Sequence, residues 1–188
     1  MSIRRKVISV VDAGVLCNVP TDVMLRPQRA TDVLIVTDFS GSPSDDKMDY
    51  SQIMVAAVQA WQNGMKFPSI NFQKMVNLPP KECIVLEDVN DDECPIVIWF
   101  TLCNKTFRNL KNFKPRNSTE PIPDGETFND FNVFTKETAY STFDFDYTAL
   151  EFDRLNEMMY HTITSHLSTI KDVLKRATEK KRKRLAAV

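Results

Sequence analysis

One carboxylate near the N-terminus combines a residue type and a position that can support acid–base chemistry. Asp12 directly follows the apolar run 7–11 (Val-Ile-Ser-Val-Val) and precedes Ala13 and Gly14. A carboxylate held at the end of a strand can accept a proton from a nucleophile or orient one. An aspartate at such a position can also cap a helix or close a turn, so the spacing alone leaves both interpretations open.

Arg29 ends the block 26–29 (Arg-Pro-Gln-Arg). A guanidinium can bind an anionic group or stabilise negative charge. The alternative for Arg29 is a structural ion pair with Asp32 or Asp38. Arg26, in the same block, is interpreted as structural.

Basic residues gather at both ends of the chain. Arg4, Arg5 and Lys6 precede the first apolar run. Each basic residue near an anionic bilayer contributes about 1 kcal/mol, so this cluster predicts contact with anionic lipid, with a solvated flank as the alternative. In the segment 175–184, seven of ten residues are basic. We interpret it as a solvated or disordered end, and we expect no nucleic-acid partner because no aromatic–basic recognition motif accompanies it.

The histidines and cysteines lack the spacing of a metal or nucleophile site. His161 and His166 lie five residues apart, which does not place both on one helix face, so ordinary surface histidines are expected. The cysteines form no CxxC pair and predict free buried thiols in a reducing compartment; they are Cys17, Cys83, Cys94 and Cys103. No cofactor or metal is expected to bind this chain.

The apolar pattern predicts strands and helices in alternation. Short β-branched or apolar runs predict strands at 7–11, 33–37, 82–86 and 95–102. The last of these is apolar on both faces, which is typical of a central strand. Helical spacing predicts helices at 51–62, ended by Gly64, and at 149–177. The proline-containing segment 111–126 is predicted to be a loop.

These elements predict an α/β protein with a substantially parallel sheet. Ligands bind near the carboxyl ends of the strands in such sheets, which is where Asp12 would lie. The 188 residues, 43% of them hydrophobic, suffice for one domain. The apolar runs are too short for a signal peptide or a membrane span, so a soluble cytosolic protein is expected.

Several sequence blocks in a fixed order resemble the cytosolic, group IV phospholipase A₂ family. They are 11–14 (Val-Asp-Ala-Gly), 18–20 (Asn-Val-Pro), 24–29 (Met-Leu-Arg-Pro-Gln-Arg) and 32–40 (Asp-Val-Leu-Ile-Val-Thr-Asp-Phe-Ser). The resemblance continues through 42–45, 81–83, 94–95, 107–108 and 141–143, and spans about residues 4–176. The Arg-Pro-Gln-Arg block, at its distance from the aspartate, is its specific part.

The resemblance implies a patatin-like fold, in which a mixed sheet of the lysophospholipase/phospholipase type carries covering helices. Residues 1–176 would form the C-terminal portion of that catalytic domain, and 177–188 a disordered basic tail. Asp12 would belong to a Ser–Asp dyad and take the serine proton directly, and Arg29 would be an arginine required for activity. The intact enzyme would hydrolyse the sn-2 acyl ester of glycerophospholipids at a cytoplasmic membrane surface. Calcium is implied for the full-length family, through a domain absent from this chain.

The sequence departs from the family in three ways. Ala13 replaces the usual serine, and Ala30 replaces a common glycine, which puts a special backbone angle there in doubt. The third departure is the absence of the GxSGS nucleophile elbow, which an upstream part of the catalytic domain would have to supply as a partner. Ser40 lies in a partial match, but Asp38 stands where the first glycine belongs, so Ser40 is not expected to be the nucleophile. We therefore expect this chain alone to be inactive, and the alternative is a truncated, non-catalytic lipid- or protein-binding product.

Overall fold

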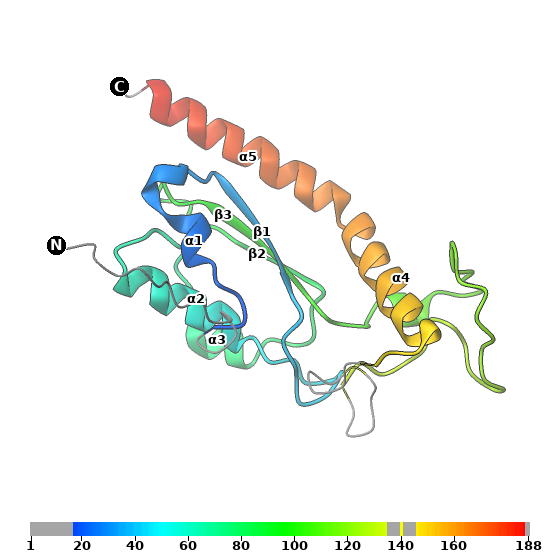
Figure 1. The fold of residues 1–188 in the computed structure, drawn as a ribbon. Coiled ribbons are helices and arrows are strands. Elements are labelled where there is room, and N and C mark those ends of the chain that lie inside the picture. The colour runs from blue at the N-terminus through cyan, green and yellow to red at the C-terminus, as the bar shows by residue number, and fades with distance from the viewer. Residues whose placement is uncertain (1–16, 135–139, 141–145, 187–188) are drawn as a thin grey trace, which may run out of the picture.

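The computed structural model describes residues 17–134, 140 and 146–186 (Figure 1). The predicted strand 7–11, Asp12 and the cluster Arg4, Arg5 and Lys6 lie outside this range. The elements of the described part are, in order, α1 (Asp22–Leu25), η2 (Pro27–Arg29), β1 (Val33–Asp38), α2 (Ser51–Gln62), α3 (Phe72–Val76), β2 (Cys83–Leu86), β3 (Ile96–Thr101), η3 (Phe107–Asn109), α4 (Ala149–Ser165) and α5 (Leu167–Ala186).

The three described strands form a mixed sheet in the order β1-β3-β2. β1 pairs with β3 in parallel, with Val33 opposite Ile96, and β2 pairs with β3 antiparallel. All six residues of β3 are buried, which confirms the predicted central strand. The expectation of a mainly parallel sheet is wrong for β2. Residues 87–95 connect β2 to β3, and a connection this short suits an antiparallel return, whereas a parallel crossover needs a dozen or more residues.

Helices cover both faces of the sheet, with α2 and α5 on opposite sides (Figure 1). Alternate residues of β3 divide the core: Val97 and Trp99 belong to the cluster that contains α2, whereas Ile98 and Phe100 pack with Val173 of α5. This two-residue alternation is the ordinary geometry of a strand. A third cluster joins η3 and α4 to the segment 128–133 beyond the strand ends.

Local signals explain where α2 and α4 begin and end. The Asp49 side chain accepts a hydrogen bond from the backbone N–H of Ser51 at 2.8 Å, at the start of α2. Gly64 follows α2 with a positive φ of 65°, and the next N–H, of Met65, donates to the carbonyl of Ala60. This pattern confirms Gly64 as the predicted stop signal. α4 starts with a capping box, absent from our predictions, between Thr148 and Glu151.

The single helix predicted at 149–177 is wrong, because the chain breaks into α4 and α5 at His166. His166 donates its backbone N–H to Ile163, and its ring Nδ1 lies 2.8 Å from the carbonyl oxygen of Thr162. The Ser165 hydroxyl also donates to that carbonyl, at 3.0 Å. Side chains therefore replace the backbone N–H that would normally bind the Thr162 carbonyl, and such competition interrupts helices.

The prediction that residues 177–188 form a disordered tail is also wrong, since α5 continues to Ala186. The reason is a set of tertiary contacts that composition does not reveal. Lys180 is only 8% exposed and donates to the carbonyls of Asp88 and Cys94 at 2.9 and 3.1 Å. Lys181 and Arg184 both bind Asp32. These contacts hold the basic end of α5 against the loops that precede β1 and β3.

The segment 111–126 contains no helix or strand, which confirms the predicted loop. Its start is attached to α4 by Arg116, whose Nε lies 3.0 Å from the Glu157 carboxylate. The same guanidinium lies 3.3 Å from the centre of the Tyr160 ring, a cation–π contact. None of the described helices is long and apolar enough to cross a bilayer.

Candidate functional site

The carboxyl end of β1 is defined by Asp38, a buried carboxylate with two hydrogen-bond donors. Its Oδ2 accepts from the Trp99 indole N–H at 3.0 Å, and its Oδ1 accepts from the backbone N–H of Ser40 at 2.9 Å. Asp38 therefore ties β1 to β3 and shapes the turn that follows β1. Each of its two carboxylate oxygens accepts a hydrogen bond from a neutral donor, which indicates a structural role at this edge.

The segment that follows Asp12 in sequence reaches this same edge of the sheet. Asn18 donates from its side-chain amide to the Ser40 hydroxyl at 3.3 Å, and the Cys17 thiol lies 3.9 Å from the side-chain oxygen of Gln52. Asp12 itself lies outside the described residues. Asn18, six residues after Asp12, is attached near the carboxyl end of β1, and ligands of α/β proteins usually bind at the carboxyl ends of strands.

Ser40 does not have the surroundings of a nucleophile. A nucleophile elbow is a sharp turn that leads directly from a strand into a helix. Here β1 ends at Asp38, and residues 39–50 are irregular before α2 begins. Ser40 instead accepts a hydrogen bond from Asn18, which gives it a role in holding the segment after Asp12.

Arg29 lies in η2 at the amino end of β1, the end opposite Asp38. Its side chain is exposed, and neither Asp32 nor Asp38 binds it within the described part of the chain. The expected alternative, a structural ion pair, is therefore wrong. Asp32 binds Lys181 and Arg184 of α5 instead, and its pKa reflects this: burial tends to raise it, but the hydrogen bonds and charges of the two cations lower it overall.

Ala30 retains the special backbone angle that the sequence put in doubt. It follows Arg29 with φ 47° and ψ 46°, the left-handed region, and donates its N–H to the carbonyl of Pro27. A residue with a Cβ is disfavoured there relative to glycine. The substitution therefore preserves the shape of the turn that carries Arg29, at a cost in stability.

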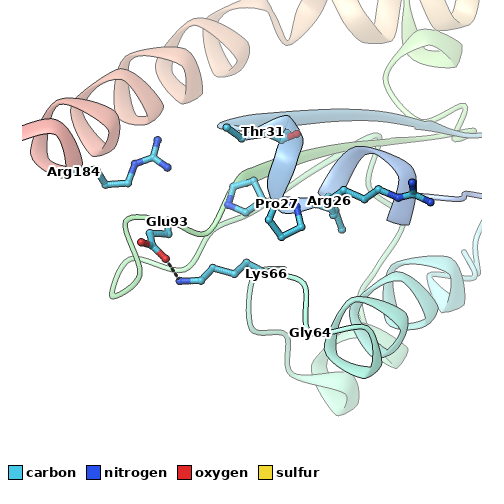
Figure 2. Close-up of a pocket in the computed structure, with 10 residues that line it drawn as sticks. Arg26, Pro27, Thr31, Gly64, Lys66, Glu93 and Arg184 are labelled. Carbon is cyan, nitrogen blue, oxygen red and sulfur yellow. Dashed lines mark ion pairs between the residues drawn. The ribbon is translucent and has the colours of Figure 1, made fainter. Parts of the chain in front are cut away.

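A cavity of about 370 Å³ opens beside this turn, at the amino ends of β1 and β3 (Figure 2). Its charged groups are largely neutralised by one another. Lys66 lies 2.7 Å from the carboxylates of both Asp91 and Glu93, and Arg184 binds Asp32. The cavity lies at the edge opposite Asp38 and presents no nucleophile–base pair. The residues that line it are Leu25, Arg26, Pro27, Ala30, Thr31, Gly64, Lys66, Glu93, Pro95 and Arg184.

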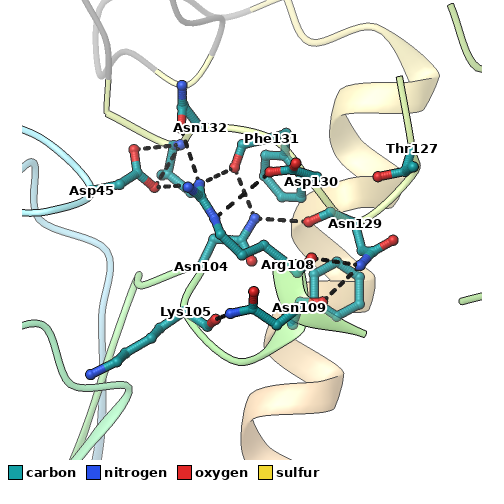
Figure 3. A network of polar contacts seen from close by, with 12 residues as sticks. Asp45, Asn104, Lys105, Arg108, Asn109, Thr127, Asn129, Asp130, Phe131 and Asn132 are labelled. Carbon is teal, nitrogen blue, oxygen red and sulfur yellow. Dashed lines mark hydrogen bonds and ion pairs between the residues drawn. The ribbon is translucent and has the colours of Figure 1, made fainter. Parts of the chain in front are cut away.

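Several polar residues, some of them in the family-like blocks, act as structural hydrogen-bond centres. The Asp45 carboxylate accepts from the backbone N–H groups of Val133 and Phe134 at 2.9–3.1 Å and pairs with Arg108 at 3.4 Å. Asn129 donates to three carbonyls around η3, including that of Phe107 (Figure 3). Such centres fix loop positions because buried backbone groups need partners. Sequence reasoning missed these roles, since no local pattern signals contacts that are 19–89 residues apart.

Glu82 is a second such centre and is almost fully buried. It accepts from the backbone N–H groups of Lys105 and Thr106 at 3.2 and 2.6 Å and from the Thr106 hydroxyl. The other side of Thr106 meets His161, whose Nε2 lies 3.3 Å away. Neither His161 nor His166 is a surface histidine, because both are half-buried. His161 packs against the Phe107 ring and His166 against Phe100.

The described cysteines are all free thiols, as expected. Burial raises the pKa of Cys83 and Cys94 to about 11 and that of Cys103 to about 12. The thiolate is the nucleophilic form of cysteine, so these three side chains are poor nucleophiles near neutral pH. Within the described ranges, no group of three or more histidine, cysteine, aspartate or glutamate side chains could hold a metal ion.

Comparison with known proteins gives a consistent assignment, although no family model matches the chain. The chain is 31% identical to mouse cytosolic phospholipase A2 zeta over 176 residues, which is 93% of this chain and 20% of that protein. In structure it resembles human GIVD cytosolic phospholipase A2, with a TM-score of 0.72 and 21% identity over 90% of this chain and 22% of the other. The complex of that enzyme with methyl gamma-linolenyl fluorophosphonate matches with a TM-score of 0.70 and 20% identity, over 94% and 25% of the two chains.

The chain thus spans about one fifth to one quarter of the length of the relatives it matches. The structural matches share its mixed sheet and covering helices, and the sequence match extends over nearly all of it. The resemblance expected from the sequence blocks is confirmed: the chain belongs to the cytosolic phospholipase A₂ family and corresponds to a C-terminal region of its members.

Proposed function

We propose that this chain is the lobe of a patatin-like phospholipase A₂ catalytic domain that supplies the aspartate of a Ser–Asp dyad. The intact enzyme would hydrolyse the sn-2 acyl ester of glycerophospholipids. The serine would come from an upstream part of the catalytic domain with a GxSGS elbow, because no such motif occurs in these 188 residues. Asp12 and Arg29 are the residues we assign to the chemistry.

The observation that carries this proposal is the attachment of the segment after Asp12. Asn18 binds Ser40 at the carboxyl end of β1, in a chain related to a phospholipase over 93% of its length. This attachment favours a position for Asp12 at the edge where ligands of α/β proteins bind. Asp38, at the carboxyl end of β1, already binds Trp99 and Ser40, so we assign the role of the base to Asp12.

The proposed reaction uses the two residues in distinct ways. The Asp12 carboxylate takes the proton of the serine hydroxyl as that oxygen attacks the ester carbonyl. The lysophospholipid leaves with a proton returned by Asp12, and water then releases the fatty acid from the serine by the same steps in reverse order. Arg29 has no competing carboxylate among the described residues, but it lies at the amino end of β1, opposite Asp38, so we propose that it supports activity from outside the reacting centre.

The surface of β1 suits a junction with the rest of a catalytic domain. Ile35 and Phe39 are 51% and 58% exposed, although both are large and apolar. β1 has one described neighbour, β3, so its other edge is open to a further strand. We propose that the upstream, serine-bearing part joins along this edge and covers these side chains.

We place the enzyme in the cytoplasm and at membrane surfaces, with Arg4, Arg5 and Lys6 in contact with anionic lipid. The family's calcium dependence would come from another domain. The proposed steps are assigned to side chains of the catalytic domain alone.

A chimaeric enzyme tests this proposal directly. The chain would replace the corresponding C-terminal region of mouse cytosolic phospholipase A2 zeta, and release of sn-2 fatty acid would be measured with the chain alone and with the chimaera. We expect activity from the chimaera and none from the chain alone. Asp12→Asn should abolish turnover, and Arg29→Gln should lower it by about a hundredfold. The matched controls, Asp46→Asn and Arg26→Gln, change exposed residues of the same types and should leave turnover intact.

Two results would contradict the proposal. Turnover by the isolated chain that disappears in Asp12→Ala would mean that the nucleophile lies within these 188 residues. A folded, active chimaera that is insensitive to Asp12→Asn would remove Asp12 from the reaction. If the chimaera folds but stays inactive while the chain alone binds lipid vesicles, the alternative holds, and the chain is a non-catalytic, lipid-binding product.

A further inference from the structure

α2 has no charged side chain, although it is a helix of twelve residues at the surface of the described fold. Its inner side packs on the sheet through Ile53, Ala56 and Ala60, which are fully buried. A helix with one packed side ordinarily carries charged residues on the other side, as α4 and α5 do, whereas a helix that is apolar all round is usually buried. The composition of α2 therefore indicates that its outer side also has a partner.

The outer side of α2 carries a row of large apolar side chains. Met54, Val58 and Trp61 follow one another at spacings of four and three residues, so they share one side of the helix. Val58 and Trp61 are 38% and 80% exposed. In the neighbouring α3, Phe72 and Val76 are four residues apart and are 46% and 66% exposed. Single exposed apolar residues are ordinary, but a contiguous group of them marks an interaction site.

These side chains form a groove of about 340 Å³ between α2 and α3, which we call the α2–α3 groove. Both helices lie on the side of the sheet opposite α5 (Figure 1). Gln59 is the one polar residue in the lining, and none of the lining residues is charged. The groove can therefore gain affinity only from apolar contact and from the amide of Gln59. The residues that line it are Met54, Val55, Val58, Gln59 and Phe72.

We propose that the α2–α3 groove binds an apolar segment of the upstream, serine-bearing part of the catalytic domain. The chain spans 20% of the length of mouse cytosolic phospholipase A2 zeta, so most of such a protein is available to cover this face. The inference rests on the proposed function, because that function requires the upstream part. It adds a second contact, on a helical face of the sheet, to the contact proposed for the open edge of β1.

Other occupants fit the groove less well. In a two-fold dimer centred on the groove, two identical concave surfaces would face each other and leave a void. A nucleic acid or a lipid headgroup needs cations, and the lining residues supply none. An apolar ridge from another part of the same domain needs neither cations nor symmetry.

Cysteine labelling tests this contact without requiring turnover. Val58→Cys would be made in the isolated chain and in the chimaera with mouse cytosolic phospholipase A2 zeta, and both would be treated with a charged maleimide. Mass spectrometry of the peptide that contains position 58 measures the rate and separates it from the native thiols. We expect labelling to be about tenfold slower, or more, in the chimaera, because a covered thiol reacts only when the contact opens.

Val89 provides a matched control of the same residue type. It is 78% exposed, lies outside the groove and is flanked by the acidic residues of the segment 87–93. Val89→Cys should therefore be labelled at the same rate in the isolated chain and in the chimaera. As a second measurement, Val58→Lys should shift the unfolding of the chimaera to lower urea and change that of the isolated chain little, whereas Val89→Lys should shift neither.

The outcomes separate this proposal from the proposed function. Equal labelling of Val58→Cys in the isolated chain and in a folded, active chimaera would overturn the groove contact and leave the phospholipase function standing. Protection in a folded but inactive chimaera would support the groove contact and count against the function alone. Protection in the isolated chain that grows with its concentration would assign the groove to a second copy, and protection by phosphatidylcholine vesicles would assign it to lipid; either result overturns the proposal.

Discussion

At the scale of single residues, three carboxylates in the family-like blocks hold the fold together. Asp38, Asp45 and Glu82 are each occupied by indole, backbone or hydroxyl donors. Their positions in the family-like blocks therefore reflect loop construction. The residue type alone would have made each of them as attractive a catalytic candidate as Asp12.

Ala30 gives a prediction at this scale. Its left-handed backbone, with φ 47°, costs an alanine energy that a glycine avoids. We expect Ala30→Gly to raise the free energy of unfolding by about 1 kcal/mol. The greater conformational entropy that glycine gives the unfolded chain offsets part of this gain. Urea denaturation followed by circular dichroism measures this change.

Ala57→Gly is a suitable comparison, because it places glycine inside α2 and should destabilise by about 1 kcal/mol. Destabilisation by Ala30→Gly similar to that of Ala57→Gly would mean that the turn after Arg29 has an ordinary right-handed backbone.

At the scale of elements, the packing of the basic end of α5 against the sheet and its loops is the main feature that amino-acid composition did not predict. Its inner side joins the sheet through apolar contacts and fixes the loops before β1 and β3 through cations. The tie to Asp32 connects residues about 150 positions apart in sequence. One carboxylate thereby holds two cations of the C-terminal turns of α5.

The ion pairs of Asp32 with Lys181 and Arg184 predict that the stability of the fold depends on pH. Burial alone would raise the Asp32 pKa, but Lys181 and Arg184 lower it below the ordinary value of 3.8. Because the folded state holds the ionised form more tightly, this stabilisation is complete above about pH 4 and is lost as the pH falls through the lowered pKa. Asp32→Asn should cost about 1 kcal/mol at pH 7 and progressively less below pH 4.

Thermal or urea unfolding between pH 7 and pH 2.5 compares the parent with Asp32→Asn. Asp46→Asn, at an exposed carboxylate, controls for the loss of one charge. The free energies of unfolding of the parent and of Asp32→Asn should converge as the pH falls. A constant difference down to pH 2.5 would mean that protonation of Asp32 does not weaken the packing of α5.

At the scale of the whole molecule, the described part has two closed faces and an incomplete edge. α2 and α5 cover the sheet, but no described strand pairs with the outer edge of β1, and the side chains of Ile35 and Phe39 are exposed. An uncovered strand with apolar neighbours is a template for pairing with another chain. The relatives, of which this chain spans about one fifth, have further sequence that can fill that position.

We therefore expect the isolated chain to self-associate at micromolar concentrations. Ile35→Lys should shift it toward monomer, because a lysine on an open strand opposes edge-to-edge pairing. Sedimentation velocity across a concentration series measures this shift. Val58→Lys, at an exposed apolar position on α2, is the comparison and should change association less. A parent chain that remains monomeric over the whole series would contradict the open edge.

The sequence alone determined the elements whose signals are local and the family whose blocks are contiguous. The β-branched run of β1, the two-sided apolar pattern of β3, the spacing of α2 and the stop at Gly64 depend on neighbours a few residues apart, and each was predicted correctly. Tertiary structure decided what depends on distant partners: the reversal of β2, the break at His166 and the order of the basic end of α5. It also decided against the alternative interpretation of Arg29, a structural ion pair, because Asp32 binds Lys181 and Arg184 of α5 and no local pattern records that choice.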